Sequence, residues 1–189
     1  GLTTRVLSST IATKENYIME TQLSLFGEPI RRLLHDVDSF DWNAPRLLED
    51  YEDLKDEMKE FSDYNPRWLK VHRAGPMGMQ HALTWKDIVG GGRVAVGYYR
   101  QLRGEEIKEH TDTGCMTRIN VLLTDGGCTL HIGGNALSYS AALINVNQYR
   151  HSVGVADRDR IIFSLIFLDH DYHEVKRRYG EYQETLVAA

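Results

Sequence analysis

The segment RIIFSLIFLD, residues 160–169, is apolar at nearly every position after its arginine. Successive side chains of a β-strand point to opposite faces, so a strand that is apolar at both must be covered on both faces. We therefore expect a central strand buried between two layers. Arg160, at the head of this strand, should lie at the mouth of the core. A cation in that place needs an anionic partner, either from the protein or from a ligand.

Five further short segments resemble strands, because they are rich in β-branched and aromatic residues and are separated by glycine-rich turns. They are WLKVHR (68–73), RVAVGYYRQL (93–102), MTRINVLLT (116–124), CTLHIG (128–133) and ALINV (142–146). Short strands in this number predict a mainly β fold with N-terminal helices, in which two sheets form a sandwich or a double-stranded β-helix, the cupin-like jelly roll. A parallel α/β fold is disfavoured, because no helix-length segment separates the strands after residue 90.

The first third of the chain has a helical pattern. Asn43-Ala44-Pro45 supplies a cap candidate and an early proline, and apolar residues then recur at three- and four-residue spacing up to Asn65-Pro66. A weaker helical stretch covers residues 30–34. We expect one structural domain with three parts: an N-terminal helical segment over residues 1–66, a jelly-roll core over 67–175 and a C-terminal tail over 176–189.

Composition limits the kinds of partner. The 189 residues carry a formal net charge of −5, which argues against a nucleic-acid backbone as the main partner. The two cysteines form no disulfide framework or zinc-knuckle pattern, and no apolar run reaches membrane-spanning length. We therefore predict a cytoplasmic protein with no membrane partner.

A polar group interrupts the strand-rich region at residues 108–123, KEHTDTGCMTRINVLL. Side chains two apart on an extended chain share a face, so His110 and Asp112 can offer a nitrogen and an oxygen to one metal ion. His131 and His151 are candidates for a third ligand. His131 alternates with apolar neighbours on a predicted strand and is interpreted as structural. His151 is favoured because Arg160 follows nine residues later.

Two histidines and one carboxylate fill three of six octahedral positions. Mixed nitrogen and oxygen ligands with open positions favour non-haem Fe(II) oxygen chemistry over structural zinc. A keto acid that chelated the metal through two oxygens would leave one position for O2. Its distal carboxylate would need a bidentate cation such as Arg160, and Ser164, on the same strand face, could add a hydrogen bond. Arg118 and Asn120 share a face of their strand and could line the same pocket.

The pattern H-x-D followed by a distal histidine and then an arginine resembles the Fe(II)/2-oxoglutarate-dependent dioxygenases. Within them, HTDTGCMTRINVLL, LHIGGNALSYSAALINVNQYRHSV and RIIFSLIFLD are similar to the aspartyl/asparaginyl β-hydroxylase group and the related free-proline hydroxylases. The similarity covers roughly residues 93 to 169. Asp112 places the chain with members that keep the complete triad, and it argues against a halogenase.

The resemblance implies that His110, Asp112 and His151 are iron ligands. It makes Arg160 the anchor of the 2-oxoglutarate C5 carboxylate and Arg118 a second contact to cosubstrate or substrate. The implied reaction is hydroxylation of an amino acid, free or within a peptide or protein. It uses Fe(II), O2 and 2-oxoglutarate, and converts 2-oxoglutarate to succinate and CO2.

Two alternatives remain open at the level of sequence. One is a non-catalytic cupin-like module that keeps the metal and 2-oxoglutarate site but uses it as a sensor, which would give no turnover of 2-oxoglutarate. The other is an oxygenase that acts on a nucleobase or nucleotide. The acidic balance speaks against a nucleic-acid substrate, although a pocket for a free nucleotide needs no basic surface.

Overall fold

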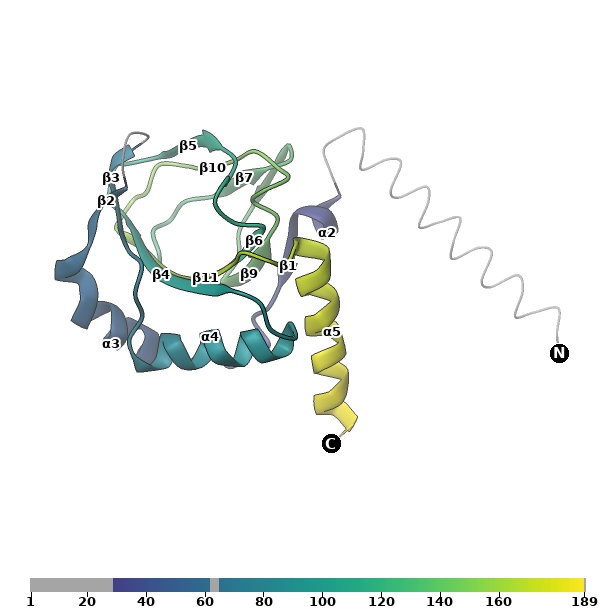
Figure 1. Cartoon of the computed structure of the whole chain (residues 1–189). Helices are drawn as coiled ribbons and strands as arrows, with labels where there is room; N and C mark the ends of the chain where they lie inside the picture. Colours follow the sequence, from purple (N-terminus) through teal and green to yellow (C-terminus); the bar gives the residue numbers. More distant parts are fainter. Residues whose placement is uncertain (1–28, 62–64, 189) are drawn as a thin grey trace.

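The computed structural model describes residues 29–61 and 65–188, and Figure 1 shows two facing antiparallel sheets with helices packed outside the larger one. The larger sheet has the order β1 (Leu34–Asp36), β9 (Ala141–Ile144), β6 (Thr117–Asp125), β11 (Arg160–Phe167), β4 (Val94–Gln101), β3 (Asn65–Val71), β2 (Lys59–Phe61). The smaller sheet has the order β5 (Ile107–His110), β10 (His151–Val153), β7 (Leu130–Ile132), β8 (Asn135–Leu137).

Strand β11 lies in the middle of the larger sheet, between β6 and β4, and all eight of its residues are buried. Its alternate residues Ile162 and Ile166 belong to the apolar cluster between the two sheets. Phe163 and Phe167 belong to the cluster beneath the helices. The prediction of a strand covered on both faces is confirmed, and the two-sheet architecture follows from it.

The outer layer consists of α3 (Ala44–Leu54), α4 (Pro76–Ile88) and α5 (Tyr172–Ala188), with the short α2 (Ile30–Leu33) and the 3-10 helix η1 (Lys55–Glu57). Figure 1 shows α3 and α4 across the outer face of the larger sheet and α5 beside its edge. Among the described residues, no helix combines the length and the apolar character that a membrane crossing requires.

Helix α3 begins where predicted, with Asn43 in a left-handed conformation before Ala44-Pro45, and its apolar stripe is buried. It ends at Leu54, earlier than the sequence pattern suggested. The chain then forms β2, in which Glu60 pairs with Leu69 of β3, so sheet hydrogen bonds replace a further helical turn. The predicted helical segment 1–66 thus contains two short strands, and its first 28 residues lie outside the described part of the chain.

Helix α4 was not predicted. Its buried face consists of Gly78, His81, Ala82 and Trp85, which gives a weak apolar period. The helix is fixed by tertiary contacts: the amide of Gly78 donates to the buried carboxylate of Asp50 on α3 at 2.9 Å. His81 Nε2 lies 2.8 Å from the carbonyl oxygen of Trp42. Both contacts join segments far apart in sequence, so local periodicity could not reveal them.

The predicted C-terminal tail over residues 176–189 is wrong, because this region forms most of α5. Tyr172, Val175 and Tyr179 recur at helical spacing and are buried against the core. The ring of Tyr179 stacks on Trp85 with centroids 4.9 Å apart, and Trp85 stacks on Trp42 at 5.8 Å. An aromatic face of this size buries enough apolar surface to fix the helix on the core.

Replacing Trp85 by alanine tests the aromatic stack that binds the helices together. The side chain is fully buried, so Trp85→Ala should lower the free energy of unfolding by about 3–5 kcal/mol in a urea titration. Leu83→Ala, at a 60% exposed position of the same helix, is the control and should change it by less than about 0.5 kcal/mol. Equal effects of the two substitutions would contradict this packing.

Candidate metal centre

The register of the smaller sheet brings the predicted metal ligands together. His151 at the start of β10 lies opposite His110 at the end of β5. Asp112 follows in the loop after β5, where its amide donates to the carbonyl of Val146 at 3.0 Å. One ligand atom from each of His110, Asp112 and His151 lies within 4.8 Å of the others. In the described part of the chain this is the single cluster of three such groups.

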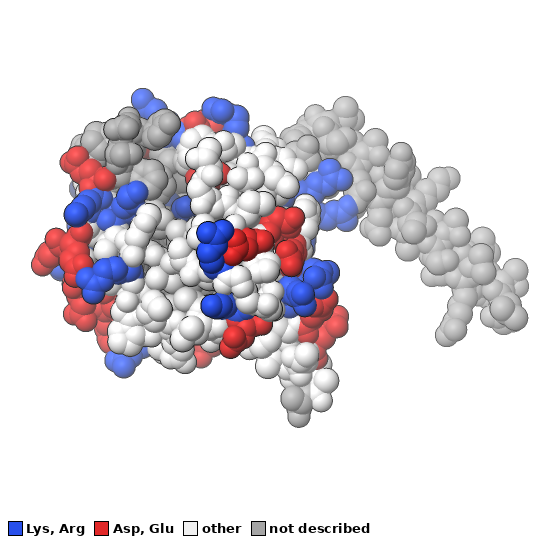
Figure 2. Space-filling model, viewed as in Figure 1, with Lys and Arg blue, Asp and Glu red and all other residues white. Residues whose placement is uncertain are grey.

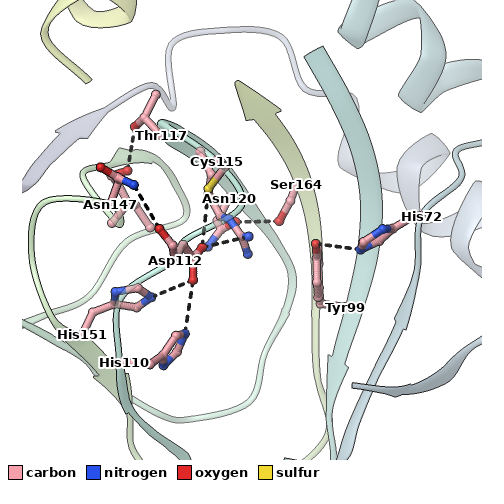
Figure 3. A network of polar contacts seen from close by, with 12 residues as sticks. His72, Tyr99, His110, Asp112, Cys115, Thr117, Asn120, Asn147, His151 and Ser164 are labelled. Carbon is pink, nitrogen blue, oxygen red and sulfur yellow. Dashed lines mark hydrogen bonds and ion pairs between the residues drawn. The ribbon is translucent and has the colours of Figure 1, made fainter. Parts of the chain in front are cut away.

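The Nε2 atoms of both histidines point to the same carboxylate oxygen of Asp112. Asp112 Oδ1 lies 3.3 Å from His110 Nε2 and 3.8 Å from His151 Nε2, and Figure 3 shows both rings pointing towards Asp112. The Nδ1 atoms face main-chain carbonyls, at 2.7 Å for His110 and 3.2 Å for His151. A hydrogen bond at Nδ1 directs the Nε2 lone pair of each ring into the cluster, which is how metal-binding histidines are oriented.

Asn147, Cys115 and Arg118 contact Asp112 from the surrounding loops and strand. Its main-chain carbonyl accepts from Asn147 at 3.1 Å, and the thiol of Cys115 lies 3.7 Å from Oδ2. Arg118 makes an ion pair with the same Oδ2 at 2.9 Å. The guanidinium of Arg118 also lies over the ring of Tyr99, 5.2 Å from its centroid.

The electrostatics favour the metal-binding forms of two of these groups. Burial alone would raise the pKa of Asp112, but Arg118 and both histidines outweigh it and bring that pKa to about 2. Burial lowers the pKa of His151 to about 4, against the opposing effect of Asp112. The hydrogen bond to Asp112 raises the pKa of His110, against the effect of burial. At neutral pH the cluster therefore contains a carboxylate and a neutral His151, the forms that bind a metal ion.

A pocket extends from this cluster into the space between the sheets. Its polar lining includes His110, His151, Arg118, Asn120, Tyr139 and Arg160, and its apolar lining includes Ile107, Leu130, Ile144, Val146, Val153 and Ile162. The histidines and Arg160 thus line one pocket, although 41 residues of chain separate His110 from His151.

Arg160 is a buried cation without a counterion among the described residues. It is 3% exposed, and Nη2 donates to the hydroxyl of Tyr139 at 2.7 Å. Its buried Nε has no hydrogen-bond partner, and none of the described carboxylates forms an ion pair with the Arg160 guanidinium. Because a buried charge is costly unless it is paired, this guanidinium is suited to bind an anion inside the pocket.

Ser164 lies on the same face of β11 as Arg160, as expected, but its hydroxyl is already used. It is fully buried and donates to Asn120 Oδ1 at 2.6 Å. The hydroxyl beside Arg160 belongs instead to Tyr139, from the loop between β8 and β9. Tyr139 was missed by sequence reasoning, because the loop segment LSYSA has no strand or helix period to give it a direction.

The remaining histidine candidate and the nearby aromatic residues differ in whether they line the pocket. His131 is exposed on β7 and outside the cluster, in line with its structural interpretation. Tyr99 lines the pocket, whereas Tyr98 belongs to the apolar cluster under the helices. Trp68, which sequence analysis placed on a strand without a role, lines the pocket and lies edge-to-face with His110 at a centroid distance of 6.4 Å.

No family model and no curated protein matches this chain. Among solved structures, a prolyl-4-hydroxylase from Pseudomonas putida matches with a TM-score of 0.58 and 12% sequence identity, over 72% of this chain and 91% of that chain. The chain has the jelly-roll fold. The two facing sheets agree with the expectation from sequence.

Other solved structures match less well. Salicylate 1,2-dioxygenase from Pseudoaminobacter salicylatoxidans has a TM-score of 0.39 at 14% identity, over 67% of this chain and 31% of that chain. KdgF from Halomonas sp. has a TM-score of 0.40 at 14% identity, over 58% of this chain and 87% of that chain. Scores this low do not establish a shared topology.

Ser164→Ala tests the hydrogen bond that ties β11 to β6 inside the jelly roll. Asn120 Oδ1 would lose its donor, so the free energy of unfolding should fall by about 1–3 kcal/mol in a urea titration. Ser152→Ala, at a half-exposed position of β10, is the control. Unchanged stability together with weaker 2-oxoglutarate binding would contradict the structural role and make Ser164 a cosubstrate contact.

Proposed function

We propose that this protein is an Fe(II)/2-oxoglutarate-dependent dioxygenase that hydroxylates an amino acid, either free or as a residue of a peptide or protein. The observation that carries the proposal is one pocket with two complementary parts. The two histidines of the His-Asp-His cluster line it, and so does Arg160, which is buried and has no carboxylate partner among the described residues. The fold shared with a prolyl-4-hydroxylase supports the same class of enzyme.

The donor set fits iron. Two imidazole nitrogens and one carboxylate oxygen from His110, Asp112 and His151 leave open positions, which suits non-haem Fe(II) better than a closed structural zinc site. Bound iron would supply the oxygen chemistry that couples oxidation of 2-oxoglutarate to succinate and CO2 with hydroxylation of the substrate. The protein holds the three ligands in place before the metal arrives.

Arg160 is suited to bind the distal carboxylate of 2-oxoglutarate. Its planar guanidinium matches a carboxylate in a bidentate pair, and the hydroxyl of Tyr139 already orients it at 2.7 Å. Apolar side chains such as Leu130 and Ile162 line the same pocket, so an ion pair there would be stronger than in solvent.

An amino acid or peptide substrate is favoured over a nucleic acid. The net charge is −5, and Figure 2 shows acidic and basic side chains interspersed over the face in view, with no basic patch that would follow a phosphate backbone. The sensor alternative uses the same residues, so only turnover separates it from the enzyme.

The first test combines a spectrum with product formation. Under anaerobic conditions, Fe(II) plus 2-oxoglutarate should give a weak metal-to-ligand absorption band, and admission of air should give succinate. His151→Ala should lose both signals, because a ligand is missing. A panel of amino acids and peptides, followed by a mass gain of one oxygen, then identifies the substrate. A wild-type band without any succinate would favour the sensor, and neither signal would contradict the proposed function.

The second test measures metal binding through stability. A metal ion that binds only the folded chain at about 100 times its Kd should raise the free energy of unfolding by about 2.7 kcal/mol. Mn²⁺ is a convenient redox-stable probe, and removal with a chelator should reverse the gain. His131→Ala, at an exposed position outside the cluster, should keep the full gain, whereas His151→Ala should lose it. An equal gain in both variants would contradict the assigned ligands.

A further inference from the structure

Arg118 is fixed in the larger sheet next to the metal centre. It is the second residue of β6, and its backbone pairs with Ile144 of β9 on one side and Ile166 of β11 on the other. Its side chain is 13% exposed. Strand pairing on both sides fixes its main chain, and contacts with Asp112 and Tyr99 hold its guanidinium.

The guanidinium contacts protein groups in a defined arrangement. Nη2 lies 2.9 Å from Asp112 Oδ2, and the ring of Tyr99 lies beneath it at 5.2 Å. The hydroxyl of Tyr99 in turn lies 3.3 Å from His72 Nε2. Figure 3 marks this contact with a dashed line. Asp112 thus meets a cation whose own position is supported by an aromatic ring.

The two oxygens of Asp112 have different surroundings. Oδ1 faces His110 and His151, at 3.3 and 3.8 Å from their Nε2 atoms. Oδ2 faces away from them, towards Arg118 and the thiol of Cys115. The main-chain amide and carbonyl of Asp112 are also hydrogen-bonded, which fixes the backbone. Rotation of the carboxylate would break the contacts of Oδ2 with Arg118 and Cys115 and that of Oδ1 with His110.

We propose that Arg118 is a positioning residue of the metal centre, which holds Asp112 Oδ2 so that only Oδ1 is offered to the metal. This inference rests on the proposed metal site. It replaces the expectation that Arg118 mainly contacts cosubstrate or substrate. With Asp112 limited to one oxygen, His110, Asp112 and His151 would each give the metal one ligand atom. Three octahedral positions would stay open, two for a chelating keto acid and one for O2. A carboxylate that bound through both oxygens would fill one of them.

The two arginines that line the pocket thus have separate tasks. Arg118 already has a carboxylate partner within the protein, whereas Arg160 has none among the described residues. Arg118 neutralises Asp112 before a metal ion arrives, so the centre is preformed. Arg160 is left for an anionic ligand.

The experiment separates metal affinity from cosubstrate affinity. Titration calorimetry with Mn²⁺ alone, and then with 2-oxoglutarate at saturating Mn²⁺, compares wild type with Arg118→Gln and Arg160→Gln. Arg118→Gln should weaken Mn²⁺ binding by roughly 10- to 100-fold, as loss of an outer partner of a ligand does, with 2-oxoglutarate affinity unchanged. The matched control Arg160→Gln should weaken 2-oxoglutarate binding and leave Mn²⁺ affinity unchanged.

The visible absorption of bound Co²⁺, which reports coordination number, should change in Arg118→Gln and not in Arg160→Gln.

Three outcomes are decisive. Unchanged Mn²⁺ affinity with weakened 2-oxoglutarate binding in Arg118→Gln would overturn the positioning role and make Arg118 a cosubstrate contact. A wild-type chain that binds no metal would overturn the proposed function, and the positioning role with it. Wild-type metal binding that is lost in His151→Ala but unaffected in Arg118→Gln would leave the proposed function standing and overturn this inference alone.

Loss of the Arg118 cation can also impair folding, so a second variant and a measurement on the metal-free protein are included. Arg118→Lys keeps the charge without the planar fork, and it should weaken Mn²⁺ binding less than Arg118→Gln does.

In the metal-free protein, Asp112→Asn and Arg118→Gln should each lower the midpoint of urea unfolding. The double variant should lower it by less than the sum of the two shifts. Additive shifts would overturn the coupling between the two residues.

Discussion

The architecture depends on one constraint, which is that β11 must be covered on both of its faces. Ile162 and Ile166 point into the space between the sheets, while Phe163 and Phe167 point towards the helices. Covering the first pair requires a second sheet, and covering the second pair requires a helical layer. The pocket lies on the inner side of this strand, so the requirement for burial also creates the low-dielectric space in which the charged groups lie.

A charge in such a space is costly unless it has a partner of opposite charge. Asp112 has Arg118 and the two histidines, and Arg118 has Asp112 and the ring of Tyr99. Arg160 differs, because Tyr139 gives its guanidinium a hydroxyl but no negative charge. The two ends of the pocket therefore differ: the proposed cation site is the cluster of His110, Asp112 and His151, and the proposed anion site is Arg160. A dianionic keto acid that chelates a metal would satisfy both.

The helical layer supports this arrangement from outside the sheet. The stack of Trp42, Trp85 and Tyr179 joins α4 and α5 to the loop before α3, and Asp50 caps the beginning of α4. None of these residues lines the pocket. Their effect on the site is indirect, because the aromatic residues among them belong to the apolar cluster that covers the outer face of the sheet containing β6 and β11, from which Arg118 and Arg160 project.

The sequence by itself determined the mainly β fold, the strand apolar on both faces and the close spacing of His110 and Asp112, because alternation and short spacing are local properties of the chain. The roles of His151 and Arg160 were expected from the resemblance to a known family. The sequence did not reveal α4, α5 or Tyr139, since their positions depend on contacts with residues far away in sequence. Only the tertiary structure decided that Ser164 bonds to Asn120 and that Arg118 pairs with Asp112. A strand pattern indicates which face a side chain is on, but its partner is set by whichever polar group the packing of other strands brings within hydrogen-bond distance.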